Sequence, residues 1–221
     1  MPKKATAQES VLKSLRKMLA SGRLAPGQQL IQESIAARFS VSRVPVREAL
    51  KILQAEGRIV HDPHRGYFVS ELDQADLEEI YEVRALLEDA ALAIGIPKAT
   101  AKQVAIIKQH HEEGIAAAGR GDIIAMSTAN RKFHLAIFQL CEQDRLISMI
   151  EQLWDSLDAY RAVYLGEVTN RASTSAEHAK MLQAVKNKDA KESIKLEAAH
   201  RDHALKGILK QIALLEGQSR S

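Results

Sequence analysis

The sequence predicts a mainly α-helical protein of two parts, a small N-terminal domain and a larger C-terminal bundle. Three observations support this prediction. Apolar residues recur every three or four positions over most of the chain, which is the helical period. Signals for β-strands occur only before residue 70. The charge also changes, because residues 1–70 carry 12 Lys and Arg against 5 Asp and Glu, whereas residues 71–221 carry 19 against 23.

Composition excludes several classes of protein. There is no run of about 18 apolar residues, so we expect no transmembrane helix and no membrane partner. The N-terminal Met-Pro-Lys-Lys is not followed by an apolar stretch, so no signal peptide is visible. Cys141 is the only cysteine, which excludes an intrachain disulfide, favours a cytoplasmic location and suits a small buried hydrophobe. The basic N-terminal part favours a polyanionic partner.

The first elements follow from apolar spacing and chain breakers. Residues 8–21 are expected to form a helix with one apolar face. Ala25-Pro-Gly27 then interrupts the chain. Leu30-Ile31 is long enough only for a very short strand, and residues 34–39 are predicted to form a short helix. A tight turn at residues 39–42 separates that helix from the next.

The next helix is predicted to begin at Ser42 and to end at Gly57. Ser42 suits the N-cap because its hydroxyl can accept a bond from a free backbone N–H, and Pro45 falls in the first turn, where a missing N–H is tolerated. Arg43 and Arg47 are four residues apart and therefore project from one face. An ordinary amphipathic helix with solvated arginines fits equally well. As the second helix of a helix-turn-helix, it would present these arginines to DNA.

A β-hairpin is expected after this helix. Ile59-Val60 and Tyr67-Phe68-Val69 are β-type runs, and the residues between them form a turn with His64 and Arg65 at the tip. Such a tip is usually only solvated, but beside a recognition helix it is placed as a wing that reaches the minor groove or its phosphates. Residues 1–71 are therefore predicted to form a winged helix-turn-helix.

Residues 72–221 are predicted to form an all-α bundle of about six helices. The expected helices lie near 73–95, 100–118, 121–141, 144–168, 173–187 and 189–215. Arg84 interrupts the apolar stripe of the first of them, in line with Ile80 and Leu87. Because an unpaired buried charge is very costly, Arg84 needs an anion. An ion pair with Glu88, one turn on, and a ligand carboxylate are equally consistent with the sequence.

Four further polar residues fall on the expected inward faces of three helices. They are Asn130, His134, His178 and His200. A single inward His is more often a hydrogen-bonded core or surface residue than a ligand. If the three imidazoles and the amide oxygen converged, they would suit zinc, nickel, manganese or iron, with zinc as the default expectation.

The N-terminal order of elements resembles the winged helix-turn-helix of GntR-family bacterial transcription regulators. The resemblance covers roughly residues 8–70 and rests on Gly22-Arg-Leu-Ala-Pro-Gly27, Ser42-Arg-Val-Pro-Val-Arg-Glu-Ala-Leu50 and Arg65-Gly-Tyr-Phe-Val69. It implies double-stranded operator DNA as a partner. The DNA-contacting positions that it implies are Arg38, Ser42, Arg43, Pro45, Arg47, Arg65 and Gly66.

The C-terminal part resembles the FCD effector domain of the FadR subfamily of these regulators. The matching residues are Tyr81-Glu-Val-Arg84 with Leu87-Glu88, Asn130-Arg-Lys-Phe-His134, Glu177-His178 and His200. The resemblance implies a divalent metal held by Asn130, His134, His178 and His200. It also implies that Arg84 lies near a small carboxylate effector, which completes the metal's coordination shell. His203 is an alternative to His200 as a ligand.

Taken together, these features predict a ligand-responsive, DNA-binding transcription regulator. The family likeness implies a homodimer on a palindromic operator, with repression as the commoner mode of action. A metal sensor, in which the ion itself is the signal, fits the same residues. A metal-dependent hydrolase is disfavoured, because no Glu is spaced as in a His-Glu-x-x-His helix and no phosphate-binding glycine loop or serine elbow is present.

Overall fold

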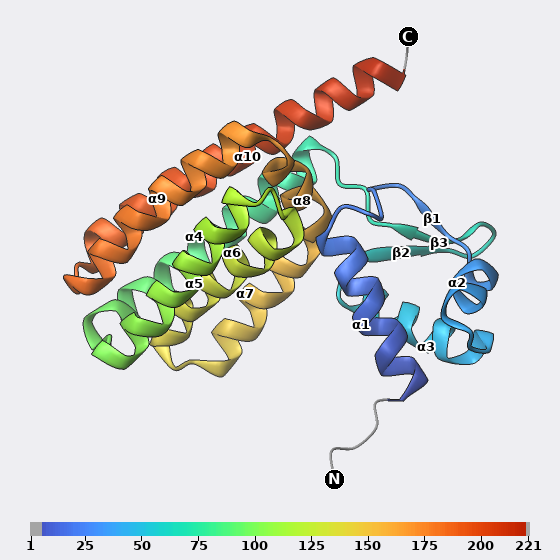
Figure 1. The fold of residues 1–221 in the computed structure, drawn as a ribbon, viewed down its shortest axis with the longest axis horizontal. Helices are drawn as coiled ribbons and strands as arrows, with labels where there is room; N and C mark the ends of the chain where they lie inside the picture. Colours follow the sequence, from blue (N-terminus) through green and yellow to red (C-terminus); the bar gives the residue numbers. More distant parts are fainter. Residues whose placement is uncertain (1–5, 220–221) are drawn as a thin grey trace.

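The computed structural model of the chain describes residues 6–219, and it has a small α/β domain at one end of an elongated helical bundle (Figure 1). The small domain has the elements that the sequence predicted, with a third strand in its sheet. They are α1 (Ala7–Ala20), β1 (Gln29–Leu30), α2 (Gln32–Phe39), α3 (Arg43–Ala55), β2 (Ile59–Asp62) and β3 (Gly66–Val69).

The sheet is antiparallel throughout and has the strand order β1-β3-β2. The predicted hairpin is formed by β2 and β3, with Ile59 opposite Val69 and Asp62 opposite Gly66. The short strand β1 pairs with β3 so that Gln29 lies opposite Phe68. The hairpin and β1 therefore form the wing of a winged helix-turn-helix.

Apolar packing fixes the orientation of α3. Val46, Leu50 and Leu53 are completely buried, as their spacing predicted, and they pack into one core with residues of α1 such as Leu15. Each buried aliphatic side chain of this kind contributes about 1.5–3 kcal/mol to stability. Because this face is fixed inward, the opposite face of α3 must be presented to solvent.

The expected capping bond of Ser42 is absent. Ser42 occupies the N-cap position of α3 with an extended backbone, but its side chain makes no capping hydrogen bond. The preceding turn is held instead by Ser40, whose φ of 52° is left-handed and whose N–H is bonded to the end of α2. The tight turn thus sets the start of α3 without the hydroxyl of Ser42, which lies in an exposed residue.

The described part of the C-terminal bundle contains seven α-helices instead of about six. They are α4 (Gln74–Gly95), α5 (Ala101–Gly119), α6 (Ile123–Phe138), α7 (Asp144–Ser156), α8 (Asp158–Gly166), α9 (Val168–Lys186) and α10 (Ala190–Ser219). Single 3-10 turns follow α4 (η1, Ile96–Lys98) and α6 (η2, Gln139–Cys141).

The additional helix arises because the segment expected to form one helix over 144–168 is broken at Leu157. Leu157 has φ −96° and ψ 3°, outside the helical region. The break lets α8 begin at Asp158, a buried carboxylate that pairs with Arg58 of the small domain and with Arg161. The apolar spacing continues through the break, so periodicity alone predicts a single helix.

The two domains are packed against each other through α8. Ala159 is part of the apolar core of the small domain, and the backbone N–H of Leu72 donates to Tyr160 Oη at 2.6 Å. The Cβ of Ala162 lies 3.4 Å from the place where a Cβ on Gly22 would stand. In the described residues, no helix is both long and apolar enough to cross a bilayer.

Candidate functional site

Arg43 and Arg47 lie on the exposed face of α3, with side chains 69% and 55% exposed. Arg43 Nη1 is 2.8 Å from Glu33 Oε1, and Arg47 Nε is 3.5 Å from Glu48 Oε1. Exposed ion pairs of this kind contribute about 0–1 kcal/mol, so both guanidinium groups can exchange these partners for phosphates or base edges.

The other expected DNA-contacting residues lie on α2, α3 and the wing. Arg38 is exposed on α2, and Pro45 is half-buried in the first turn of α3. Arg65 is exposed at the hairpin turn, with its guanidinium 4.9 Å from the centre of the Phe68 ring. Gly66 has a φ of +96°, a conformation that side chains disfavour. Figure 1 shows α2 and the hairpin tip at the end of the small domain farthest from the bundle.

The three histidines singled out in the sequence converge in the bundle. His134 on α6, His178 on α9 and His200 on α10 are all buried, and each offers a nitrogen within 4.8 Å of the other two. His134 Nε2 and His178 Nε2 are 3.0 Å apart. Three imidazole nitrogens this close, from three helices, form a donor set that a divalent transition metal accepts.

The electrostatics of the cluster keep these nitrogens available as ligands. Burial lowers the pKa of His134 well below its usual value, and the nearby His200 lowers it further. Burial and the neighbouring His134 likewise lower the pKa of His178. Neutral imidazoles keep a free lone pair, which metal binding requires.

Asn130 accompanies the histidines, whereas His203 does not. Asn130 is buried one turn before His134 on α6, and it lines one cavity with His200 and another with His178. His203 is about half-exposed and uses Nδ1 to contact Glu177 Oε1 at 2.7 Å. It lies outside the group of three converging histidines, which includes His200.

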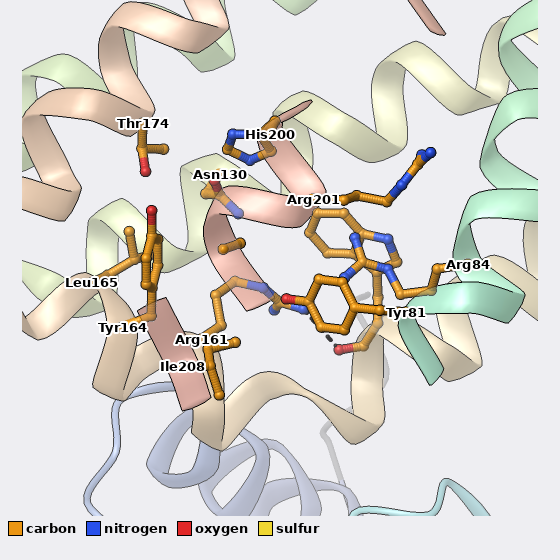
Figure 2. A pocket seen from close by; sticks show the side chains of 12 residues that line it. Tyr81, Arg84, Asn130, Arg161, Tyr164, Leu165, Thr174, His200, Arg201 and Ile208 are labelled. Carbon is orange, nitrogen blue, oxygen red and sulfur yellow. Dashed lines mark hydrogen bonds between the residues drawn. The ribbon is translucent and has the colours of Figure 1, made fainter. Parts of the chain in front are cut away.

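A small cavity adjoins the cluster (Figure 2). Its volume is about 30 Å³, which is space for one or two water molecules. Three arginines line it together with His200, namely Arg84, Arg161 and Arg201. No Asp or Glu of the described chain is among the lining residues. Tyr164 Oη and Thr174 Oγ1 also line it, and both are buried without a hydrogen-bond partner among the described residues. The lining therefore favours an anion that can also form hydrogen bonds.

Arg84 forms the ion pair that the sequence left open as one interpretation, and its role toward a ligand carboxylate stays a prediction. It is buried, and its Nε donates to Glu88 Oε1 at 2.8 Å. Its guanidinium also lies 4.7 Å from the Tyr81 ring and 4.6 Å from the Trp154 ring, on the wall of the cavity. Arg84 is therefore ion-paired with Glu88 and at the same time lines the cavity.

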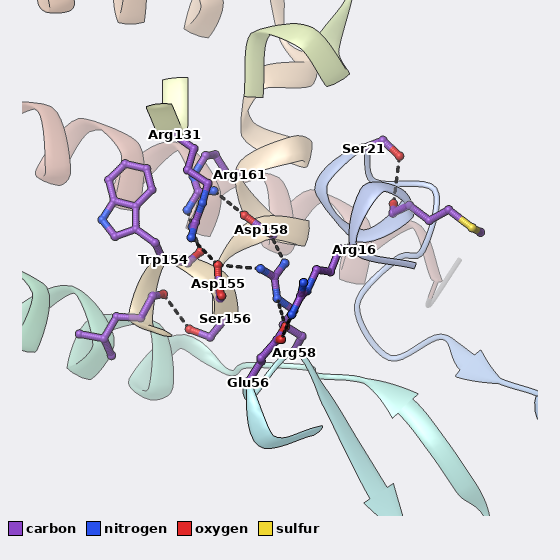
Figure 3. Close-up of polar contacts among 12 residues, drawn as sticks. Arg16, Ser21, Glu56, Arg58, Arg131, Trp154, Asp155, Ser156, Asp158 and Arg161 are labelled. Carbon is purple, nitrogen blue, oxygen red and sulfur yellow. Dashed lines mark hydrogen bonds and ion pairs between the residues drawn. The ribbon is translucent and has the colours of Figure 1, made fainter. Parts of the chain in front are cut away.

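A chain of polar contacts connects the cavity with the small domain (Figure 3). Trp154 Nε1 donates to Glu88, the partner of Arg84, and the carbonyl of Trp154 accepts from Arg161 at 2.9 Å. Arg161 donates to Asp158 at 2.7 Å.

The chain ends at Arg58, which comes just before β2. Asp158 pairs with this buried arginine, which also contacts Asp155 at 2.6 Å and Glu56 at 2.9 Å. Burial alone would lower the pKa of Arg58, but the three carboxylates raise it above its usual value. The arginine therefore stays charged at the junction of the two domains.

Sequence reasoning missed Arg161, Arg201, Trp154 and Arg58. Arg161 lies in line with Leu157 and Tyr164, the same interruption of an apolar stripe that identified Arg84. Arg201 is next to His200 and donates to Glu88, 113 residues away. Partners this distant in sequence leave no local signal.

The winged domain with its exposed basic helix and the attached helical bundle define a DNA-binding transcription regulator. Residues 7–69 match the gntR family of bacterial regulatory proteins, and residues 79–203 match the FCD domain. The chain belongs to the GntR family and carries an FCD domain.

Relatives support the same assignment. The HTH-type regulator YdhC of Bacillus subtilis is 30% identical over 195 residues, which is 86% of this chain and 85% of YdhC. McbR of Escherichia coli is 33% identical over 179 residues, or 79% of this chain and 80% of McbR. The solved structure of E. coli McbR/YncC superposes with a TM-score of 0.74 at 28% identity, covering 99% of this chain and 100% of that one. These proteins are regulators and not enzymes.

Proposed function

We propose that this regulator binds a palindromic operator as a homodimer and releases it when a small carboxylate binds, together with a divalent metal, inside the helical bundle. Repression is proposed because it is the commoner mode in the family. A cytoplasmic location follows from access to DNA. The proposed domain limits are 1–71 for DNA binding and 72–221 for sensing and dimerisation.

Contacts to DNA are assigned to the exposed face of α3, to α2 and to the wing. Arg43 and Arg47 read base edges, because a bidentate guanidinium suits guanine in the major groove. The remaining residues fix the position of the domain on the phosphate backbone. They are Arg38, Ser42, Pro45, Arg65 and Gly66.

The metal is assigned to His134, His178, His200 and the amide oxygen of Asn130, with zinc as the default ion. A bound divalent metal would supply a Lewis-acidic point that attracts a carboxylate oxygen. The convergence of three buried imidazoles beside a cavity lined by three arginines is the observation that carries this proposal. The arginines favour a carboxylate effector over a sensor for the metal alone, because they would repel a free cation and attract an anion.

Effector binding must change the packing around the cavity. A space for one or two water molecules cannot hold an organic acid unless nearby side chains move. Arg84 and Arg161 are the side chains that a carboxylate would displace most directly, because it would compete with Glu88 and Asp158 for them. Movement of Arg161 would also displace Asp158, which pairs with Arg58 of the small domain. The expected coupling between effector and operator is about 1–3 kcal/mol.

The test is a thermal-shift screen of the full-length protein with small carboxylic acids, with and without zinc, nickel or manganese. An acid present at 100 times its Kd is expected to stabilise the protein by about 2.7 kcal/mol. The shift should require metal and should disappear in His134→Ala. His61→Ala, which changes an exposed His in the other domain, is the matched control.

Elemental analysis of the same samples decides the metal assignment. Wild-type protein and His61→Ala should retain one ion per chain, and His134→Ala should retain none. Equal metal contents in all three proteins would show that the histidine cluster is not the metal site. A shift with metal but with no acid in the panel would favour the metal-sensor alternative.

A further inference from the structure

Glu197 is a buried carboxylate that the contacts described so far do not explain. It lies on α10, one turn before His200, and it is fully buried. Neither of its oxygens accepts a hydrogen bond from any residue that the structure describes. Its Oε2 is 3.3 Å from His134 Nδ1, an atom that is also buried without a hydrogen-bond partner. The two unpartnered groups therefore face each other.

The neighbouring arginines do not satisfy this carboxylate. Arg84 donates to Glu88, and Arg201 donates to Glu88 and Asp89. A buried carboxylate without donors destabilises a fold, and sequences rarely keep one without a role. The helical position of Glu197 suits an apolar residue, because it packs inward among other buried side chains. Packing therefore does not explain why a carboxyl group stands at this position.

The orientation of two imidazole rings indicates that function. His134 turns Nε2 toward His178, at 3.0 Å, and Nδ1 toward Glu197. His200 also turns Nδ1 toward a carboxylate, since this nitrogen is hydrogen-bonded to Glu177 Oε2 at 2.6 Å, and its Nε2 has no hydrogen bond to any residue that the structure describes. His178 is held differently, by stacking on the Phe133 ring with centroids 4.2 Å apart and an interplanar angle of 15°.

We propose that Glu197 and Glu177 are positioning residues, which accept the Nδ1–H of His134 and His200 and so present Nε2 of both rings to a metal ion. This inference rests on the proposed metal site. A carboxylate behind a ligating imidazole fixes its tautomer and raises its basicity, and loss of such a partner typically weakens metal binding 10–100-fold. The charge of the ion strengthens the bond that each Nδ1–H donates, so Glu197 gains its partner when metal binds.

Glu197→Leu distinguishes this role from a structural one, because metal affinity should fall while the stability of the metal-free protein does not. Removing an unpartnered buried carboxylate should leave the metal-free protein as stable as wild type or more stable. Removing the acceptor for His134 should weaken metal binding. If Glu197 only maintained the fold, its replacement would lower both the metal affinity and the stability of the metal-free protein.

The experiment measures two quantities on full-length protein stripped with a chelator. Zinc affinity is measured by competition with a chromophoric chelator, and the urea midpoint is measured without metal. Glu197→Leu should bind zinc 10–100-fold more weakly with an equal or higher midpoint. Glu177→Gln should also weaken zinc binding, but it should lower the midpoint, because the bonds to His200 and His203 are weakened. Glu192→Gln, which changes a half-exposed carboxylate on the same helix, should change neither quantity.

Each outcome is decisive. If wild-type protein binds no zinc, nickel or manganese, the proposed function fails and the inference fails with it. If wild type binds metal and Glu197→Leu binds it equally well, only the inference fails. A parallel fall in affinity and in the metal-free midpoint would make Glu197 a structural residue. If Glu197→Leu does not fold, Glu197→Met, which has a similar length but no oxygen to accept the N–H, is compared instead, and an unchanged cobalt(II) absorption spectrum and affinity would overturn the proposal.

Discussion

The two domains place their charges in opposite ways. Of the buried polar and charged residues in the described part of the chain, two lie before residue 71 and fourteen after it. The two in the small domain, Arg58 and Ser70, both lie near the junction with the bundle. The bundle, in contrast, buries arginines, carboxylates and histidines close to one another. Its net charge is slightly negative, yet the lining of its central cavity is cationic.

This difference separates a domain that displays its binding groups from one that encloses them. The winged domain needs only an apolar core to hold α3 rigid, because DNA meets its arginines at the surface. The bundle is proposed to enclose a small molecule, which would explain why its polar groups are buried and paired with one another. Buried charged residues are thus concentrated where a ligand is expected. Arg58 is the buried charge through which the winged domain contacts the bundle.

The largest expected effect comes from removing the ion pairs of Arg58 at the junction of the two domains. Arg58→Met would leave Asp155 with only Arg131 and Asp158 with only Arg161, and removal of one member of a buried ion pair typically costs about 3–5 kcal/mol. Urea unfolding followed by circular dichroism measures the loss. Arg16→Met is the control, because Arg16 pairs with Glu56 but its side chain is 43% exposed. A loss below 1 kcal/mol for Arg58→Met would mean that the junction is not held by this network.

Replacing the displayed arginines should separate binding from stability. Arg43→Ala and Arg47→Ala are each expected to weaken operator binding by about 1–3 kcal/mol, while the unfolding free energy stays within about 0.5 kcal/mol of wild type. Fluorescence anisotropy with a labelled operator measures the first quantity. Lys13→Ala is a control with the same change of charge, because Lys13 is exposed on α1. Equal losses of operator affinity in all three variants would mean that the two arginines contribute only general electrostatic attraction.

The smallest expected effect concerns the wing. Arg65→Ala should remove one phosphate contact, which reduces the dependence of log affinity on log salt by about one and changes sequence preference little. Anisotropy titrations between 50 and 200 mM salt measure this slope. If discrimination among operator variants falls instead, Arg65 reads bases and belongs with Arg43 and Arg47.

Much of this architecture could be predicted from local patterns. The spacing of Val46, Leu50 and Leu53 predicted both α3 and its buried face, and turn residues between β-type runs predicted the wing. The inward positions of His134, His178 and His200 were also visible, because each interrupts an apolar face.

The remainder depends on contacts between distant residues. The break at Leu157 lies next to Asp158, which pairs with Arg58 about 100 residues earlier, and the apolar period gives no sign of it. The role of Glu197 depends on the ring orientation of His134, which no spacing encodes. Patterns therefore identified which residues face inward, and only the fold shows which partner each one meets.

The small size of the cavity also has a consequence for timing. An acid cannot enter a space of one or two water molecules until the arginines around it have moved. If the proposed acid enters only after such an opening step, the rate of response should level off as the acid becomes more concentrated. The fraction of time that the bundle is open then sets the threshold at which the regulator reacts.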